Sequence, residues 1–140
     1  MRVWCKIGSL MQSTTDDIVS AIIEKWSAGF QRLDADALAA LYSRQALFYG
    51  SNPTLYRGNE GVAAYFNALP RWRTPAVRFT DVTTEQVGPD LVNFAGTANF
   101  DLGEEAAPLS VKITWVIVRE DGDWKIISHH VSSKTPLIEQ

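Results

Sequence analysis

The chain has 140 residues, of which 46% are hydrophobic and 21% charged, as is typical of one globular domain with its own core. The net charge is −3, and no run of Lys or Arg could follow a phosphate backbone. No stretch approaches the ~20 apolar residues of a membrane-spanning helix. We therefore expect neither nucleic acid nor a membrane as a partner.

Cysteine content and the N-terminal sequence further limit the classes of protein to which this chain can belong. Cys5 is the only cysteine, so an internal disulfide is excluded, and the Cys/His spacing of a metal site is absent. We expect no metal and no cofactor. Residues 1–10 lack the apolar region of a signal peptide, which favours a cytoplasmic location. Met11 is an alternative start, and residues 1–12 are interpreted as an extension or as an arm that packs on a partner subunit.

The first half of the chain is mainly helical in pattern. Apolar residues recur at spacings of three and four, at Ile18, Ile22, Trp26, Phe30 and Leu33. Thr14 or Thr15 can cap a helix over residues 16–32. Asp34 caps a second, short helix that ends near Ser43. A strand over 46–50 then leads through Ser51-Asn52-Pro53, a turn sequence, to a third helix capped by Asn59.

The second half reads as four long strands, at 76–87, 91–102, 109–119 and 124–134. Asp121-Gly122 lies between the last two and predicts a tight hairpin. Helices followed by strands indicate an α+β fold with the helices on one face of an antiparallel sheet. Long strands that twist around helices leave a conical cavity where the helices do not fill it.

The last strand holds both histidines of the chain, His129 and His130. Neighbouring side chains of a strand point to opposite faces, so only one of the two can face the interior. Alternation places His130 on one face with Trp124, Ile126, Ser128 and Ser132. We predict that this is the cavity face, and that His129 lies on the outer face, at a dimer interface or in solvent.

Three segments resemble the nuclear transport factor 2-like superfamily, in particular its SnoaL-like branch, over residues 15–134. The first is the helix with Trp26 and Phe30, which is followed by Leu38-Ala39-Ala40-Leu41-Tyr42. The second is the run Phe48-Tyr49-Gly50-Ser51-Asn52-Pro53, which is followed by Arg57-Gly58. The third runs from Trp115 through Asp121-Gly122-Asp123-Trp124 to His130-Val131-Ser132. The resemblance implies one domain over 13–140. In it a curved antiparallel or mixed sheet forms a cone around three N-terminal helices, encloses a pocket and pairs with a second copy as a homodimer.

The third segment is also similar to the end of the association domain of calcium/calmodulin-dependent protein kinase II. That domain assembles into larger rings and buries arginines in its pocket. Ala98 and Trp115 stand near the matching positions of this sequence. We therefore expect an apolar pocket rather than an anion site.

Four residues are the candidate ligand contacts: Tyr49, Trp115, His130 and Ser132. His130 is also the candidate catalytic residue, because imidazole can carry a proton near neutral pH. The alternatives are a structural role for His130 and core packing for Trp115. Among the carboxylates, Asp34 and Asp36 are interpreted as capping residues and Asp101 as a surface residue. The arginines around Trp72 either gate the cavity or lie in solvent.

Two functions follow from these observations. The first is a homodimer that binds a small, largely apolar ligand in its cone, with a possible metal-free acid/base activity of isomerase, cyclase or hydratase type carried by His130. The second is an oligomerisation module without catalysis, similar to the kinase association domain.

Overall fold

The computed structural model describes residues 14–104 and 106–138, so the predicted arm over residues 1–12 lies outside the described residues. The described chain is α+β, and the fold-class prediction is confirmed. Its helices are α2 (Thr15–Gln31), α3 (Ala35–Ala39) and α4 (Gly58–Asn67). Its strands are β1 (Tyr42–Tyr49), β2 (Leu55–Arg57), β3 (Ala76–Gln86), β4 (Leu91–Asp101), β5 (Leu109–Glu120) and β6 (Asp123–Ser133).

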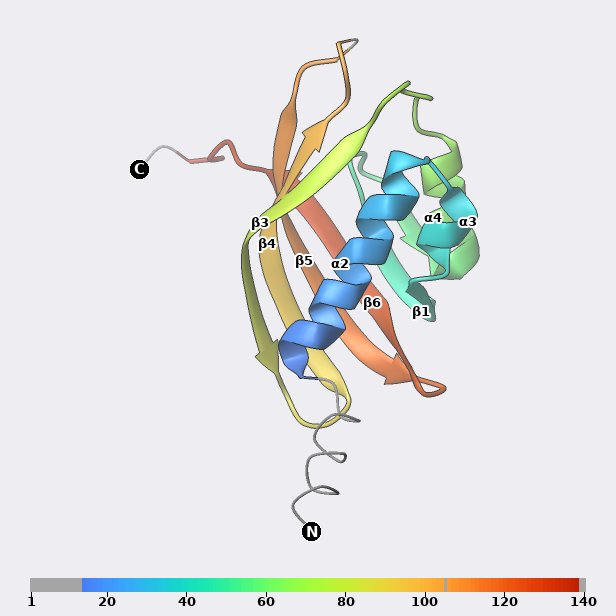
Figure 1. Cartoon of the computed structure of the whole chain (residues 1–140), viewed down its shortest axis with the longest axis vertical. Helices are drawn as coiled ribbons and strands as arrows, with labels where there is room; N and C mark the ends of the chain where they lie inside the picture. Colours follow the sequence, from blue (N-terminus) through green and yellow to red (C-terminus); the bar gives the residue numbers. More distant parts are fainter. Residues whose placement is uncertain (1–13, 105, 139–140) are drawn as a thin grey trace, which may run out of the picture.

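The six strands form one open sheet in the order β2-β1-β6-β5-β4-β3. β1 pairs with β6 in parallel, and every other neighbouring pair is antiparallel. The long strands curve behind α2, and α3 and α4 lie beside it on the same side of the sheet (Figure 1). The helices therefore cover the inner face of the sheet and leave its outer face uncovered among the described residues.

Helix α2 supplies the centre of the core. Its start is a capping box in which Thr14 and Asp17 exchange side-chain and backbone hydrogen bonds. Its buried stripe runs through Ile22, Trp26 and Phe30. The Trp26 ring contacts five other aromatic rings, those of Phe30, Phe66, Phe79, Phe100 and Trp115. The predicted helix over 16–32 is thus confirmed, with the shift of one residue that is usual at helix ends.

Several element boundaries differ from the sequence prediction. The second helix ends at Ala39 rather than near Ser43, and residues Leu55–Arg57 form a short strand, β2, where none was predicted. Strand β1 begins at Tyr42 rather than at residue 46, because Tyr42 pairs with Ile126 of β6, more than eighty residues away. Asn59 does not cap α4, since Arg57 holds the cap position. The Asn59 amide instead donates to the backbone carbonyls of Ala39 and Tyr42 and ties α4 to the start of β1.

A β-bulge in β6 overturns the predicted placement of the histidines. Ile126 pairs with Ile117 of β5, whereas Ser128 pairs with Val116, so Ile127 is an extra residue. An extra residue reverses the alternation of every side chain that follows it. His129 is therefore buried, with 3% of its surface exposed, and His130 is exposed on the outer face. The prediction that His130 faces the cavity and His129 the outside is wrong.

No helix in the described part of the chain is long and apolar enough to cross a membrane.

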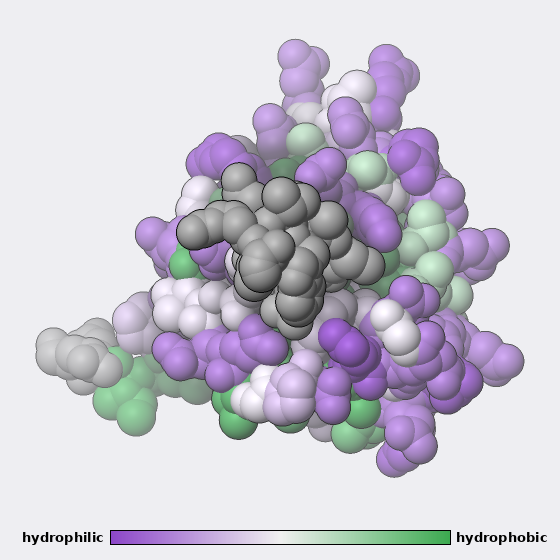
Figure 2. Space-filling view, turned by 60° about the horizontal axis from the view of Figure 1, so that its bottom comes forward, coloured by the Kyte–Doolittle hydropathy of each residue, from purple (hydrophilic) through white to green (hydrophobic). Residues whose placement is uncertain are grey.

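Figure 2 views the end of the molecule where α2 begins. Hydrophilic side chains dominate this end, and apolar ones gather along the lower margin of the view. Among residues 14–104 and 106–138, no cluster of three or more His, Cys, Asp or Glu could hold a metal ion.

Candidate functional site

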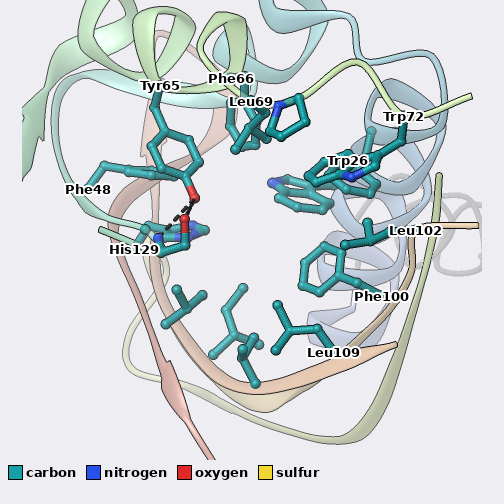
Figure 3. Close-up of a pocket in the computed structure, with 17 residues that line it drawn as sticks. Trp26, Phe48, Tyr65, Phe66, Leu69, Trp72, Phe100, Leu102, Leu109 and His129 are labelled. Atoms are coloured by element: carbon teal, nitrogen blue, oxygen red, sulfur yellow. Dashed lines mark hydrogen bonds between the residues drawn. The ribbon is translucent and has the colours of Figure 1, made fainter. Parts of the chain in front are cut away.

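A cavity of about 240 Å³ lies between the helices and the inner face of the sheet. Apolar and aromatic side chains form most of its wall, and no Asp, Glu, Lys or Arg is among the described residues that line it. Figure 3 shows Phe48, Tyr65 and His129 on one wall and Trp26, Trp72, Phe100 and Leu102 on the opposite one. The remaining lining residues are Phe30, Gly50, Ser51, Phe66, Leu69, Pro70, Leu109, Val111, Ile113 and Val131.

His129 is the one imidazole in this wall, and its ring is held on several sides. It stacks on Phe48 with 4.0 Å between ring centroids and 17° between planes. Its Nδ1 lies 2.9 Å from Nε1 of Trp115 and 2.8 Å from the hydroxyl oxygen of Tyr42. The Tyr42 oxygen in turn accepts from Nε1 of Trp26 over 3.0 Å. Four buried side chains from α2, β1, β5 and β6 thus form one hydrogen-bonded chain.

The donors around Nδ1 determine where the imidazole proton lies. An indole N–H can only donate, so Nδ1 must accept from Trp115. Because the Tyr42 oxygen already accepts from Trp26, the Tyr42 proton is free to point to Nδ1 as well. We therefore assign the Nε2–H tautomer of neutral His129 from this network.

Burial keeps this imidazole neutral. Desolvation lowers the pKa of His129 to about 3, and the neighbouring His130 adds a smaller effect in the same direction. Burial also raises the pKa of Tyr42 well above its ordinary value, so its hydroxyl keeps its proton. His129 and Tyr42 are therefore both uncharged at neutral pH.

Tyr65 and Ser51 place a second polar group in the cavity wall. The Tyr65 oxygen accepts from the backbone N–H of Ser51 over 2.9 Å and lies 2.7 Å from its hydroxyl. Gly50 makes this arrangement possible, because a Cβ at Gly50 would lie 2.4 Å from Cζ of Tyr65. One of the two hydroxyls donates to the other, so the pair keeps a single free hydroxyl proton, on Tyr65 or on Ser51.

The structure separates the four predicted ligand contacts. Tyr49 is 42% exposed on the outer face and packs against His130 with 5.5 Å between ring centroids. Ser132 is exposed on the same face. Trp115 is buried on the inner face, but it stands behind His129 and is not in the cavity wall. None of Tyr49, His130 and Ser132 reaches the cavity, because the β6 bulge turns the strand and β1 presents Phe48 inward instead.

The other polar candidates lie outside the cavity and make hydrogen bonds to the backbone. The Asp34 side chain accepts from the backbone N–H of Ala37 and caps α3, as predicted. Asp101 is exposed and accepts from the N–H of Gly103. Arg71 donates to the carbonyl of Leu33 over 3.0 Å, which ties the loop after α4 to the end of α2. None of these residues lines the cavity.

Sequence reasoning missed His129, Phe48 and Tyr65, but one signal was present. Ile126 and Ile127 are adjacent apolar residues in a strand that otherwise alternates, and such a pair can mark a bulge. The hydrogen-bonded chain from Trp26 to His129 has no local signal, since it joins residues that are 14 to 87 positions apart in sequence.

Comparison with models of known protein families assigns the chain to one family. The model of the SnoaL-like domain matches residues 19–136. The chain belongs to the SnoaL-like domain family. Within the described residues, this SnoaL-like protein has the three helices and the mixed sheet that the resemblance implied. A comparison with curated proteins gives no significant match.

Several solved structures share the fold of this SnoaL-like protein. One, from Xanthomonas campestris, is provisionally named as a calcium/calmodulin dependent protein kinase II association domain. It is 22% identical in sequence and superposes with a TM-score of 0.78, and the match covers 90% of this chain and 91% of that one. A second, from Novosphingobium aromaticivorans, is provisionally named as a scytalone dehydratase; it is 13% identical with a TM-score of 0.74, over 84% and 83% of the two chains. At these identities the likeness shows the fold alone.

Proposed function

We propose that this SnoaL-like protein binds a small, neutral, largely apolar ligand in its cavity. The observation that carries the proposal is the cavity itself, about 240 Å³ of space that remains although Trp26 and Phe30 stand in its wall. An apolar cavity with a few directed polar groups is the usual form of a small-molecule site. With a share of about 30 Å³ for each water, this space corresponds to about eight water molecules, so the fitting ligand is small, of one or two rings.

Binding is favoured over acid–base catalysis by the groups in the wall. Proton transfer next to a carbonyl needs a base whose pKa lies near the working pH. The described wall has no carboxylate, and the pKa of His129 is far below neutral. His130, the residue that the sequence suggested as proton carrier, is exposed on the other face of the sheet.

We further propose that two copies pair through the outer face of the sheet. Leu47 is 46% exposed on this face, and Thr114 and Val116 occupy its centre on β5. Lys112 is the charged residue nearest to this centre on β5. A surface with few charges and many β-branched residues suits contact with a second sheet.

The alternative function is an oligomerisation module without a ligand. The structural neighbour named for a kinase association domain supports it, since that structure aligns with 90% of the chain. Both functions predict assembly, so the oligomeric state does not separate them. Only occupancy of the cavity does.

Thermal unfolding with a panel of neutral one- and two-ring compounds tests the proposal. A ligand that binds the folded state raises Tm. We expect at least one compound to do so in the wild type and in Thr114→Arg, and none in Val131→Phe, which fills the cavity. Light scattering should give a dimer for the wild type and Val131→Phe and a monomer for Thr114→Arg. A panel that leaves the wild-type Tm unchanged would contradict ligand binding, and a monomeric wild type would contradict the dimer.

A further inference from the structure

His129 has one ring nitrogen in the core and the other at the cavity. Nδ1 is occupied by the N–H of Trp115 and the hydroxyl of Tyr42. No hydrogen bond within the described residues involves Nε2. Yet no fully buried side-chain nitrogen or oxygen of these residues lacks a partner. Nε2 is therefore not sealed in the core, and the cavity that His129 lines is the space it faces.

We propose, on the basis of the ligand-binding function above, that His129 selects ligands with a carbonyl-type oxygen by donating a fixed Nε2–H hydrogen bond. The proton cannot move to Nδ1 without placing two donors, Nδ1–H and the indole N–H of Trp115, against each other at 2.9 Å. The imidazole is thus a directed donor rather than a switchable acid or base. Phe48 fixes the plane of the ring, and with it the direction of the N–H.

The rest of the wall defines the ligand class. A buried N–H left without an acceptor costs free energy, so an oxygen in the ligand is preferred over a hydrocarbon edge. A charged group would lose its hydration without meeting an opposite charge in the described wall. The ligand class is therefore a neutral, mostly aromatic or alicyclic molecule with a ketone, aldehyde, ester or similar oxygen at one end.

Tyr65 is the competing donor for such an oxygen. Figure 3 places it on the same wall as His129, with its hydroxyl at Ser51. The Tyr65 oxygen accepts from the Ser51 backbone N–H, and its own proton can go either to the Ser51 hydroxyl or to a ligand oxygen. A ligand oxygen bound by Tyr65 would not depend on His129, so a variant that lacks the Tyr65 hydroxyl separates the two donors.

The test compares 1-indanone with indane, which share a bicyclic frame and differ in the carbonyl. One hydrogen bond corresponds to about a tenfold difference in affinity, so we expect 1-indanone to bind about tenfold more tightly than indane. Titration by NMR measures both affinities in the wild type and in Tyr65→Phe. The tenfold ratio should persist in Tyr65→Phe. A ratio near one in the wild type, or its loss in Tyr65→Phe, overturns the assignment to His129.

A second measurement reads the His129 tautomer directly, first in the free protein and then with 1-indanone. Long-range ¹H–¹⁵N correlation spectra of the free protein at pH 7 should show His129 as the neutral Nε2–H tautomer, and 1-indanone should shift the Nε2 proton downfield. An Nδ1–H tautomer overturns the inference. If neither compound binds while the Nε2–H tautomer is found, the ligand-binding function fails and the His129 geometry stands. The two failures are therefore distinguishable.

Discussion

The indole N–H of Trp115 donates to Nδ1 of His129 over 2.9 Å, from one strand of the sheet to the next. The contact joins the core to the cavity wall, since Trp115 packs behind the site while His129 lines it. Trp115 also stacks on Phe94 with 4.5 Å between ring centroids, which holds the indole in place. A buried indole thus sets the proton position of an imidazole that lines the cavity.

Trp115→Phe should therefore cost more stability than the loss of packing alone. The substitution keeps a ring against Phe94 but removes a buried donor, which corresponds to about 1–3 kcal/mol in the free energy of unfolding. Urea denaturation measures the change. Trp72→Phe is the matched control, because the half-buried Trp72 makes no side-chain hydrogen bond among the described residues. Equal losses for the two variants would refute a role for the Trp115 N–H.

Acid should destabilise the protein through His129. Its pKa is about 3 in the folded state and about 6.5 in the unfolded state, so between these values only the unfolded state binds the proton. The contribution of neutral His129 to the free energy of unfolding is fully present above pH 6.5 and is lost as pH falls toward 3. From pH 6.5 to 4.5 we expect the free energy of unfolding to drop by about 2–3 kcal/mol from this group.

The pH prediction is checked by urea denaturation of the wild type and of His129→Asn, whose amide oxygen can still accept from Trp115 and Tyr42. Carboxylates titrate in both proteins, so the difference between the two slopes isolates His129. The slope of stability against pH should be smaller in the variant. Parallel slopes would show that His129 does not titrate far below neutrality in the folded state.

Gly50→Ala should destabilise the fold by displacing Tyr65. A Cβ at residue 50 would meet Cζ, Cε1 and the hydroxyl of Tyr65 at 2.4 to 2.7 Å. The Tyr65 ring is held by Phe48 and Phe66, with centroids 4.8 and 5.1 Å away, so it cannot move freely. We expect a loss of about 1–3 kcal/mol in thermal unfolding.

A double-mutant cycle tests the cause of the Gly50 effect. In a Tyr65→Ala background the ring is absent, so the added methyl group should cost much less than in the wild type. The same penalty in both backgrounds would mean that backbone freedom at Gly50, and not contact with Tyr65, is responsible.

The two neighbouring histidines should differ strongly in the stability that is lost when each is replaced by alanine. His129→Ala leaves a cavity and strands the donors of Trp115 and Tyr42, so a loss of about 3 kcal/mol or more is expected. His130→Ala changes an exposed side chain and should alter stability by about 0.5 kcal/mol or less. Thermal unfolding with and without 1-indanone gives both readouts. Loss of the ligand effect in His130→Ala with its retention in His129→Ala would return the site to His130.

Local signals sufficed for most of the elements and for the fold class of this protein. The caps at Thr14 and Asp34, the helical spacing through Trp26 and the turn at Asp121-Gly122 act within a few residues, so the sequence displays them directly. The order of helices and strands then indicated the α+β class and, through the resemblance, the SnoaL-like family.

The site depended on pairing across the whole chain. Alternation along β6 was readable, but the bulge at Ile127 arises where β6 meets β5, and it exchanges His129 and His130 between the two faces. The parallel pairing of β1 with β6 brings Tyr42 near His129, although 87 positions separate them in sequence. Sequence alone therefore determined most of the elements and that one histidine faces inward. Only the tertiary structure decided which one, because strand register is a property of two strands and not of either by itself.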